Sequence, residues 1–64
     1  MTKSLTQRQE QVLSLIAKGK TDKEIAGMLS IACGTVGTHV TMILERLQAS
    51  SRAHAVAIRF KIKG

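Results

Sequence analysis

The chain has no proline, no tryptophan and no tyrosine, and its one aromatic residue is Phe60. A core must therefore be built from Leu, Ile, Val, Met and Ala, whose side chains suit packing between helices. Nowhere do β-branched residues alternate with polar ones over the length of a strand, so no strand is predicted. These absences predict an all-α fold.

Cysteine and long apolar runs are also scarce. Cys33 is the only cysteine and cannot close a disulfide within the chain. No apolar run approaches the ~20 residues of a membrane span or resembles the hydrophobic part of a secretory signal. We therefore expect a soluble, cytoplasmic protein with no membrane partner. Its 64 residues leave room for one domain, residues 1–64, in which residues 1–4 are expected to be a flexible start.

Negative charge is the third scarcity. Four acidic residues, the last of them Glu45, stand against ten lysines and arginines, which gives a net charge of +6. An excess of this size favours a polyanionic partner such as nucleic acid or an acidic membrane surface. Charge alone leaves a second interpretation open, because it also keeps small basic domains soluble.

Two helix starts are marked by capping boxes, in which a threonine is followed three residues later by Gln or Glu. Thr6 with Gln9 marks the first, and Thr21 with Glu24 marks the second. Gly19 can adopt the left-handed conformation that ends the first helix. With the periodic segments that follow, four helices are expected, at about residues 7–18, 22–29, 33–47 and 52–61.

The segment 33–47 has the clearest helical period of the chain. Its apolar residues fall on one stripe, which we assign to the core: Val36, Val40, Ile43, Leu44 and Leu47. At 100° per residue, small and polar residues occupy the opposite face and its flanks: Gly34, Thr35, Gly37, Thr38, Thr41, Met42 and Glu45. This outward face is the one that a partner would meet.

The last predicted helix has apolar residues on more than one side. Ser51 can cap its start, and Ala55, Val56 and Phe60 can face the core together. Four residues then point away from the core, and an exposed apolar pair among them favours contact with a second copy of the chain: His54, Ala57, Ile58 and Lys61.

Residues 21–47, TDKEIAGMLSIACGTVGTHVTMILERL, place a short helix only a few residues before a longer one. This is the arrangement of a helix-turn-helix. On a basic chain it offers the second helix to the major groove of DNA.

Three segments also resemble the LuxR/FixJ/GerE-type helix-turn-helix domains of bacterial transcription regulators. LTQRQEQVLSLIAKGKTDKEIAGML is similar to the opening pair of helices, TVGTHVTMILERL to the recognition helix, and SSRAHAV to the start of the fourth helix. Together they cover nearly the whole chain. The resemblance implies a four-helix domain that binds double-stranded DNA as a dimer, with the dimer contact on the fourth helix. Because two short helices bury little area, we expect this homodimer to be weak without DNA. It implies no catalysis and no cofactor.

The resemblance also assigns residues. The family's backbone-contacting positions correspond to Lys23 and Thr35, whose side chains can donate to phosphate oxygens. Its base-reading positions correspond to Gly34, Gly37, Thr38 and Thr41. Lysine is frequent at the first two of these, so glycine at both is a departure from the family pattern. Direct base readout is then expected to be weak or AT-biased. Close approach of the backbone to DNA and drift in a weak binder both remain open.

Other functions leave weaker marks in the sequence. No nucleophile–base pair, paired carboxylates or phosphate-cradling loop indicates an enzyme, and nothing indicates a small-molecule ligand. No metal site is expected, because His39 and His54 belong to different helices. His39 is expected to pack or to hydrogen-bond the backbone.

Two alternatives and one ambiguity stay open. The fold could serve as a protein-interaction or sequestering module with weakened readout, or residues 52–63 could bind a membrane surface. Five basic residues form either a phosphate-facing patch or, for most of them, a solvated face: Arg46, Arg52, Arg59, Lys61 and Lys63. The chain fits either the output domain of a longer regulator or a small stand-alone regulator.

Overall fold

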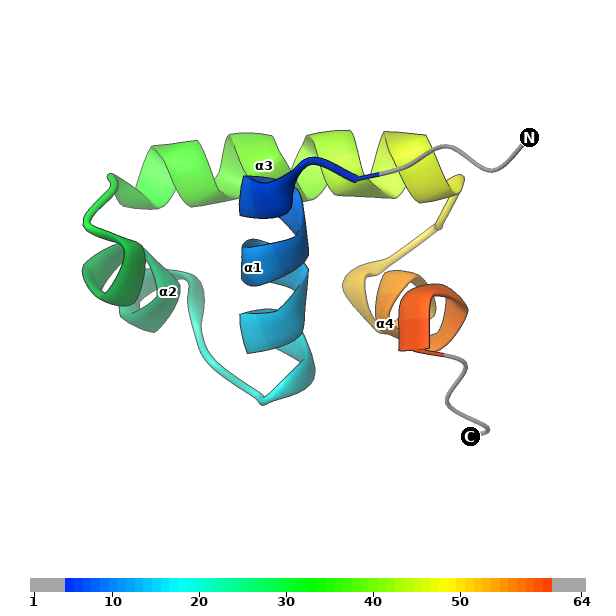
Figure 1. Cartoon of the computed structure of the whole chain (residues 1–64), viewed down its shortest axis with the longest axis horizontal. Coiled ribbons are helices and arrows are strands. Elements are labelled where there is room, and N and C mark those ends of the chain that lie inside the picture. The colour runs from blue at the N-terminus through cyan, green and yellow to red at the C-terminus, as the bar shows by residue number, and fades with distance from the viewer. Residues whose placement is uncertain (1–4, 61–64) are drawn as a thin grey trace.

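The computed structural model describes residues 5–60, and these residues form four helices and no strand. The helices are α1 (Gln7–Ala17), α2 (Asp22–Leu29), α3 (Cys33–Leu47) and α4 (Arg52–Phe60). α3 runs along one side of the molecule, α1 crosses it near its middle, and α2 and α4 lie on either side of α1 (Figure 1). The all-α fold is therefore confirmed.

Both expected capping boxes are present. Gln9 N donates to Thr6 Oγ1 at 3.1 Å, and Thr6 N donates to Gln9 Oε1 at 3.0 Å. Glu24 N donates to Thr21 Oγ1 at 3.2 Å, and Thr21 N donates to Glu24 Oε1 at 2.8 Å. Gly19 has φ +85°, as its predicted role at the end of α1 requires. Local sequence signals therefore fix where the first two helices begin.

Some predicted boundaries differ from the structure. α1 ends at Ala17, one residue before the predicted limit, because Lys18 is its C-cap, with φ −83° and ψ 0°. The predicted end of α4 at residue 61 lies outside the described residues, and so do residues 1–4.

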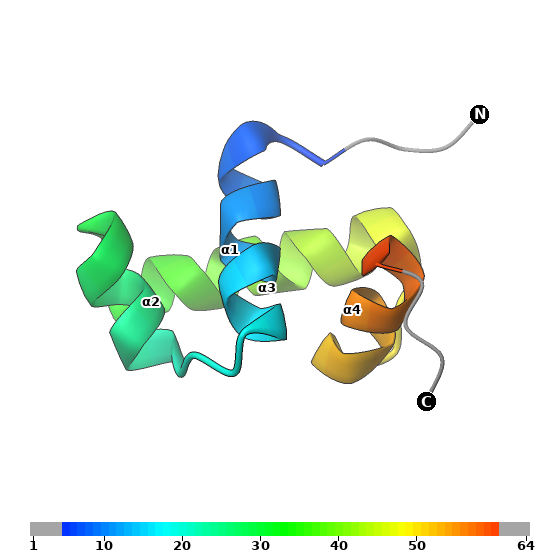
Figure 2. The same cartoon turned by 60° about the horizontal axis from the view of Figure 1, so that its bottom comes forward.

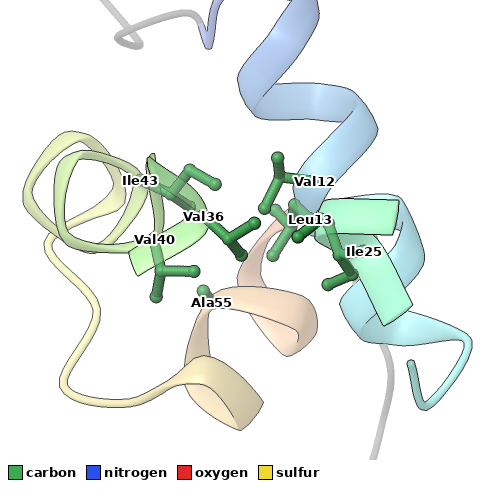
Figure 3. Close-up of a cluster of buried hydrophobic side chains, with 8 residues drawn as sticks. Val12, Leu13, Ile25, Val36, Val40, Ile43 and Ala55 are labelled. Carbon is green, nitrogen blue, oxygen red and sulfur yellow. The ribbon is translucent and has the colours of Figure 1, made fainter. Parts of the chain in front are cut away.

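The core is formed by apolar side chains from all four helices (Figure 3). Its buried members are Val12, Leu13, Ile25, Ala26, Val36, Val40, Ile43 and Ala55. Burying a side chain of Val, Leu or Ile stabilises a fold by about 1.5–3 kcal/mol. The predicted stripe of α3 supplies three of these residues, while Leu44 and Leu47 are half-buried and pack against the cluster.

The turn between α2 and α3 sets the angle between them. Ser30 caps the end of α2 in the left-handed conformation, with φ 58°. Ile31 follows it, half-buried against the core. The two helices are bent by 105° at this break, within the range of about 90–120° found in helix-turn-helix units.

The expectation that Phe60 faces the core was wrong. Its side chain is 39% exposed and lies under the guanidinium of Arg59, whose Cζ is 5.5 Å from the ring centroid. Phe60 lines an open groove of about 540 Å³ between α1, α2 and α4, together with Leu15 and the 57% exposed Met28. Arg59 also bonds to Glu10 of α1, which holds the last turn of α4 beside this groove.

Two arginines of α4 are exposed to solvent, as a solvated face requires, and each also binds an acidic residue of another helix, which was not predicted. Arg52 Nη1 and Nη2 donate to the two carboxylate oxygens of Asp22 at 2.6 and 2.9 Å. Arg59 Nε and Nη2 donate to Glu10, with Nε 2.9 Å from Oε1. All four side chains are 36–44% exposed, so each pair stabilises the fold only modestly.

Stability should fall in acid. The hydrogen bond from Arg52 lowers the pKa of Asp22, and the backbone amide of Thr21 lowers the pKa of Glu24. Groups with a lowered folded-state pKa stabilise the protein above their unfolded pKa, and this contribution is lost as pH falls through the folded value. We expect the free energy of unfolding, measured by urea titration, to decrease between about pH 5 and pH 2. In Asp22→Asn the decrease should be smaller, and an equal decrease would contradict the assignment to Asp22.

Candidate nucleic-acid interface

The outer face of α3 carries no part of the core. Gly34, Thr35, Thr38 and Thr41 are exposed and Gly37 is half-buried. The buried residues of α3 belong to the core cluster that includes Val12 and Leu13 of α1. α1 crosses in front of α3 in Figure 2. The structure therefore brings the predicted base-reading residues together on one accessible face.

Packing among residues 5–60 requires neither glycine of this face. A Cβ atom added at Gly34 or Gly37 would meet nothing within 4 Å, and neither residue has a positive φ. Each glycine inside a helix costs about 1 kcal/mol relative to alanine. The structure thus offers room for side chains at both positions.

The two threonines use their hydroxyl hydrogens within α3. Thr38 Oγ1 donates to Gly34 O at 3.1 Å, and Thr41 Oγ1 donates to Gly37 O at 3.1 Å. Serine and threonine often bond the carbonyl four residues earlier in this way. In this conformation each hydroxyl offers a partner only its lone pairs, and each side chain also offers a methyl group.

The first turn of α2 carries Lys23, the residue that is predicted to contact a phosphate. Lys23 is exposed one residue after the start of the helix, and Lys20 is exposed just before its cap. The amino end of a helix carries a partial positive charge and unpaired amides, both of which attract anions. Lys23 therefore stands where a phosphate would be attracted.

His39 lies half-buried beside this face. Its Nδ1 atom is buried and has no hydrogen-bond partner among residues 5–60, which favours packing over a backbone bond for that nitrogen. No group of three His, Cys, Asp or Glu residues within the same range could hold a metal ion.

The predicted dimer residues lie on one side of α4. His54 and Ile58 are both exposed, four residues apart and thus on one helix face, while Ala57 between them is half-buried. His54 Nδ1 accepts a hydrogen bond from Ser50 N at 3.0 Å, and His54 N donates to Ser51 Oγ at 3.1 Å, which confirms the predicted cap. Lys61 lies outside the described residues.

No single helix among the described residues is long and apolar enough to cross a membrane. α2 and α3 reach that length and composition only when taken together, and the chain bends by 105° between them.

These features define the class of the protein. A short helix bent sharply against a longer one, with two further helices closing the core, is a helix-turn-helix domain. Residues 3–59 match the model of a family described as “Bacterial regulatory proteins, luxR family”. The chain belongs to this family.

Known regulators are similar to nearly the whole chain. It is 50% identical over 60 residues to the transcriptional regulatory protein DesR of Bacillus subtilis, covering 94% of this chain and 30% of that protein. It is 52% identical over 52 residues to LiaR of the same species, covering 81% of this chain and 25% of LiaR. It is 44% identical over 57 residues to the response regulator protein VraR of Staphylococcus aureus, covering 89% of this chain and 27% of VraR. The chain thus spans less than a third of each of these relatives.

Proposed function

We propose that this chain is a double-stranded DNA-binding domain of a transcription regulator, which places α3 in the major groove. The observation that carries the proposal is the outer face of α3. It is accessible, free of core residues and set at 105° to α2, whose amino end can then meet the phosphate backbone. Membership of the luxR family and the net charge of +6 support the same function.

The residues divide into two roles. Lys23 and Thr35 contact phosphates and set the orientation of the domain on the duplex. Gly34, Gly37, Thr38 and Thr41 face the base edges. Because the threonine hydroxyls donate to carbonyls of α3, they accept from amino groups of adenine or cytosine, and their methyl groups contact thymine methyls. Readout by so few groups gives modest sequence preference.

Introducing lysine at Gly37 tests the placement of α3. The side chain has open space, so Gly37→Lys should fold and should stabilise the helix by several tenths of a kcal/mol. A lysine there can reach O6 and N7 of guanine. We expect tighter binding and a new preference for guanine in sequences selected from random duplex DNA.

The matched control is Gly27→Lys, which adds the same charge and also meets open space, but on α2. It should not change the selected base. Gly37→Lys binding with the affinity and preference of the parent would mean that α3 does not enter the groove. Absence of duplex binding by the parent at low salt would favour the interaction module that retains the fold without DNA readout.

We further propose that two copies pair weakly through α4 on DNA, by the face that carries His54, Ala57 and Ile58. One short helix against its copy buries less than the ~1,200 Å² of a stable interface, so the free domain is a monomer at low concentration. The duplex then aligns the two copies, which bind half-sites about one helical turn apart.

The exposed Ile58 provides a test of this pairing. Ile58→Glu should fold normally, bind a single half-site like the parent and lose cooperative filling of a duplex with two half-sites, as measured by footprinting. Met28→Glu serves as the control, because Met28 is also an exposed apolar residue but lies on α2 beside the groove. Equal cooperativity in Ile58→Glu and the parent would show that α4 is not the dimer surface.

A further inference from the structure

The ion pair between Arg52 and Asp22 joins the first turns of α4 and α2, two helices whose backbones lie apart. The two residues are thirty positions apart, and both guanidinium nitrogens Nη1 and Nη2 bond to the carboxylate. No Cα atoms of α2 and α4, both fully described, come within 8 Å of each other. The side chain of Arg52 therefore reaches across a gap to bind Asp22.

Asp22 is the immediate neighbour of Lys23. A carboxylate beside a phosphate-contacting lysine repels the phosphate, and this repulsion opposes binding. Asp22 is ionised at neutral pH, and the hydrogen bond from Arg52 lowers its pKa further. The negative charge of Asp22 is therefore balanced by its pairing with the guanidinium of Arg52.

Arg52 determines the net charge around the first turn of α2. Lys20 and Lys23 balance the two acids of the turn, Asp22 and Glu24. With Arg52 added, three positive charges stand against two negative ones. The net charge of this turn is therefore positive with the arginine and zero without it.

We propose that Arg52 is a positioning residue for DNA binding: it neutralises Asp22, so that the first turn of α2 and Lys23 present net positive charge to a phosphate. This inference rests on the proposed function. It also gives α4 a role in DNA binding beyond pairing, because the residue that balances Asp22 belongs to that helix.

The chain contains a matched control for this role. Arg59 binds Glu10 through two guanidinium nitrogens, as Arg52 binds Asp22, with a similar degree of exposure, and it likewise ties α4 to another helix. Glu10 belongs to α1 and lines the groove beside Phe60 instead of the first turn of α2. A merely structural contribution of an α4 arginine should therefore appear in both pairs.

The experiment measures binding of a mixed-sequence 20-base-pair duplex at about 50 mM salt by fluorescence anisotropy. We expect Arg52→Gln to weaken binding by roughly three- to tenfold, and this factor should shrink as salt is raised. Arg59→Gln should stay within about twofold of the parent. The double variant Arg52→Gln with Asp22→Asn should return to about the affinity of the parent, because the net charge of the turn is then restored.

Circular dichroism and thermal unfolding accompany each variant, so that binding is compared only where every protein is folded. Equal losses in Arg52→Gln and Arg59→Gln would overturn the proposal in favour of a structural role. A double variant as weak as Arg52→Gln would also overturn it, since Arg52 would then contact the DNA directly. Failure of the proposed function is distinguishable, because in that case the parent itself does not bind the duplex.

Discussion

The affinity of this domain for a duplex is expected to fall steeply when salt is raised from about 50 to 200 mM, by up to about a thousandfold where about six phosphates are neutralised. The reason is the balance of contacts: the base-facing surface of α3 has two glycines and two threonines, while the whole chain carries a net charge of +6. Binding that depends on phosphate contacts releases counterions, and added salt opposes that release. Anisotropy titrations at five salt concentrations give the slope of log K against log salt.

The same titrations with unrelated duplexes provide the control. If phosphate contacts dominate, affinities for different sequences should lie close together at low salt and fall in parallel. A flat response to salt would contradict the electrostatic account, because base contacts would then have to supply the affinity.

Truncating the centre of the core should have the second large effect. Leu13 of α1 is 1% exposed, and its side chain lies among those of the other helices (Figure 3). Replacing a buried leucine by alanine costs about 2–5 kcal/mol, and a small domain has only about 5–15 kcal/mol in total. Leu13→Ala should therefore be largely unfolded at moderate urea concentrations at which the parent is folded, as followed by circular dichroism.

Leu15→Ala is the matched control, because Leu15 is on the same helix but half-buried and lines the groove. Leu15→Ala should lower the free energy of unfolding clearly less than Leu13→Ala does. Similar losses of unfolding free energy in the two variants would mean that the core does not centre on the contact between α1 and the other helices.

Much of the fold was predictable because its signals are local. Each capping box, at Thr6 and at Thr21, spans four consecutive residues at the start of its helix. Gly19 follows the end of α1 and adopts a positive φ, which glycine does at no steric cost. The period of α3 likewise identified Val36, Val40 and Ile43 as buried. Such features depend only on residues that are close in sequence, so they can be predicted from the sequence alone.

The missed features depend on residues far apart in sequence. Arg52 pairs with Asp22 across thirty residues, and Arg59 with Glu10 across 49. Helical periodicity assigns a face to each residue but cannot say which helix lies opposite, so the two ion pairs were not predicted. Phe60 was misplaced for the same reason, since its exposure depends on where the last turn of α4 lies against α1.

The candidate site was predictable in its residues but not in its hydrogen bonds. Spacing alone placed Thr38 and Thr41 together on the outer face of α3. That their hydroxyls donate to Gly34 and Gly37 depends on side-chain rotamers, which a sequence leaves open. Toward a base, each threonine can therefore only accept a hydrogen bond through its hydroxyl oxygen or make a methyl contact.

The central claim is that duplex DNA meets the outer face of α3 and the amino end of α2. It is tested most directly by a two-dimensional NMR titration of the ¹⁵N-labelled domain with a duplex at low salt. We expect the largest amide shifts at Lys23, Gly34, Gly37, Thr38 and Thr41, with little change around the groove that Phe60 lines. Shifts concentrated at the groove, with α3 unchanged, would contradict the account.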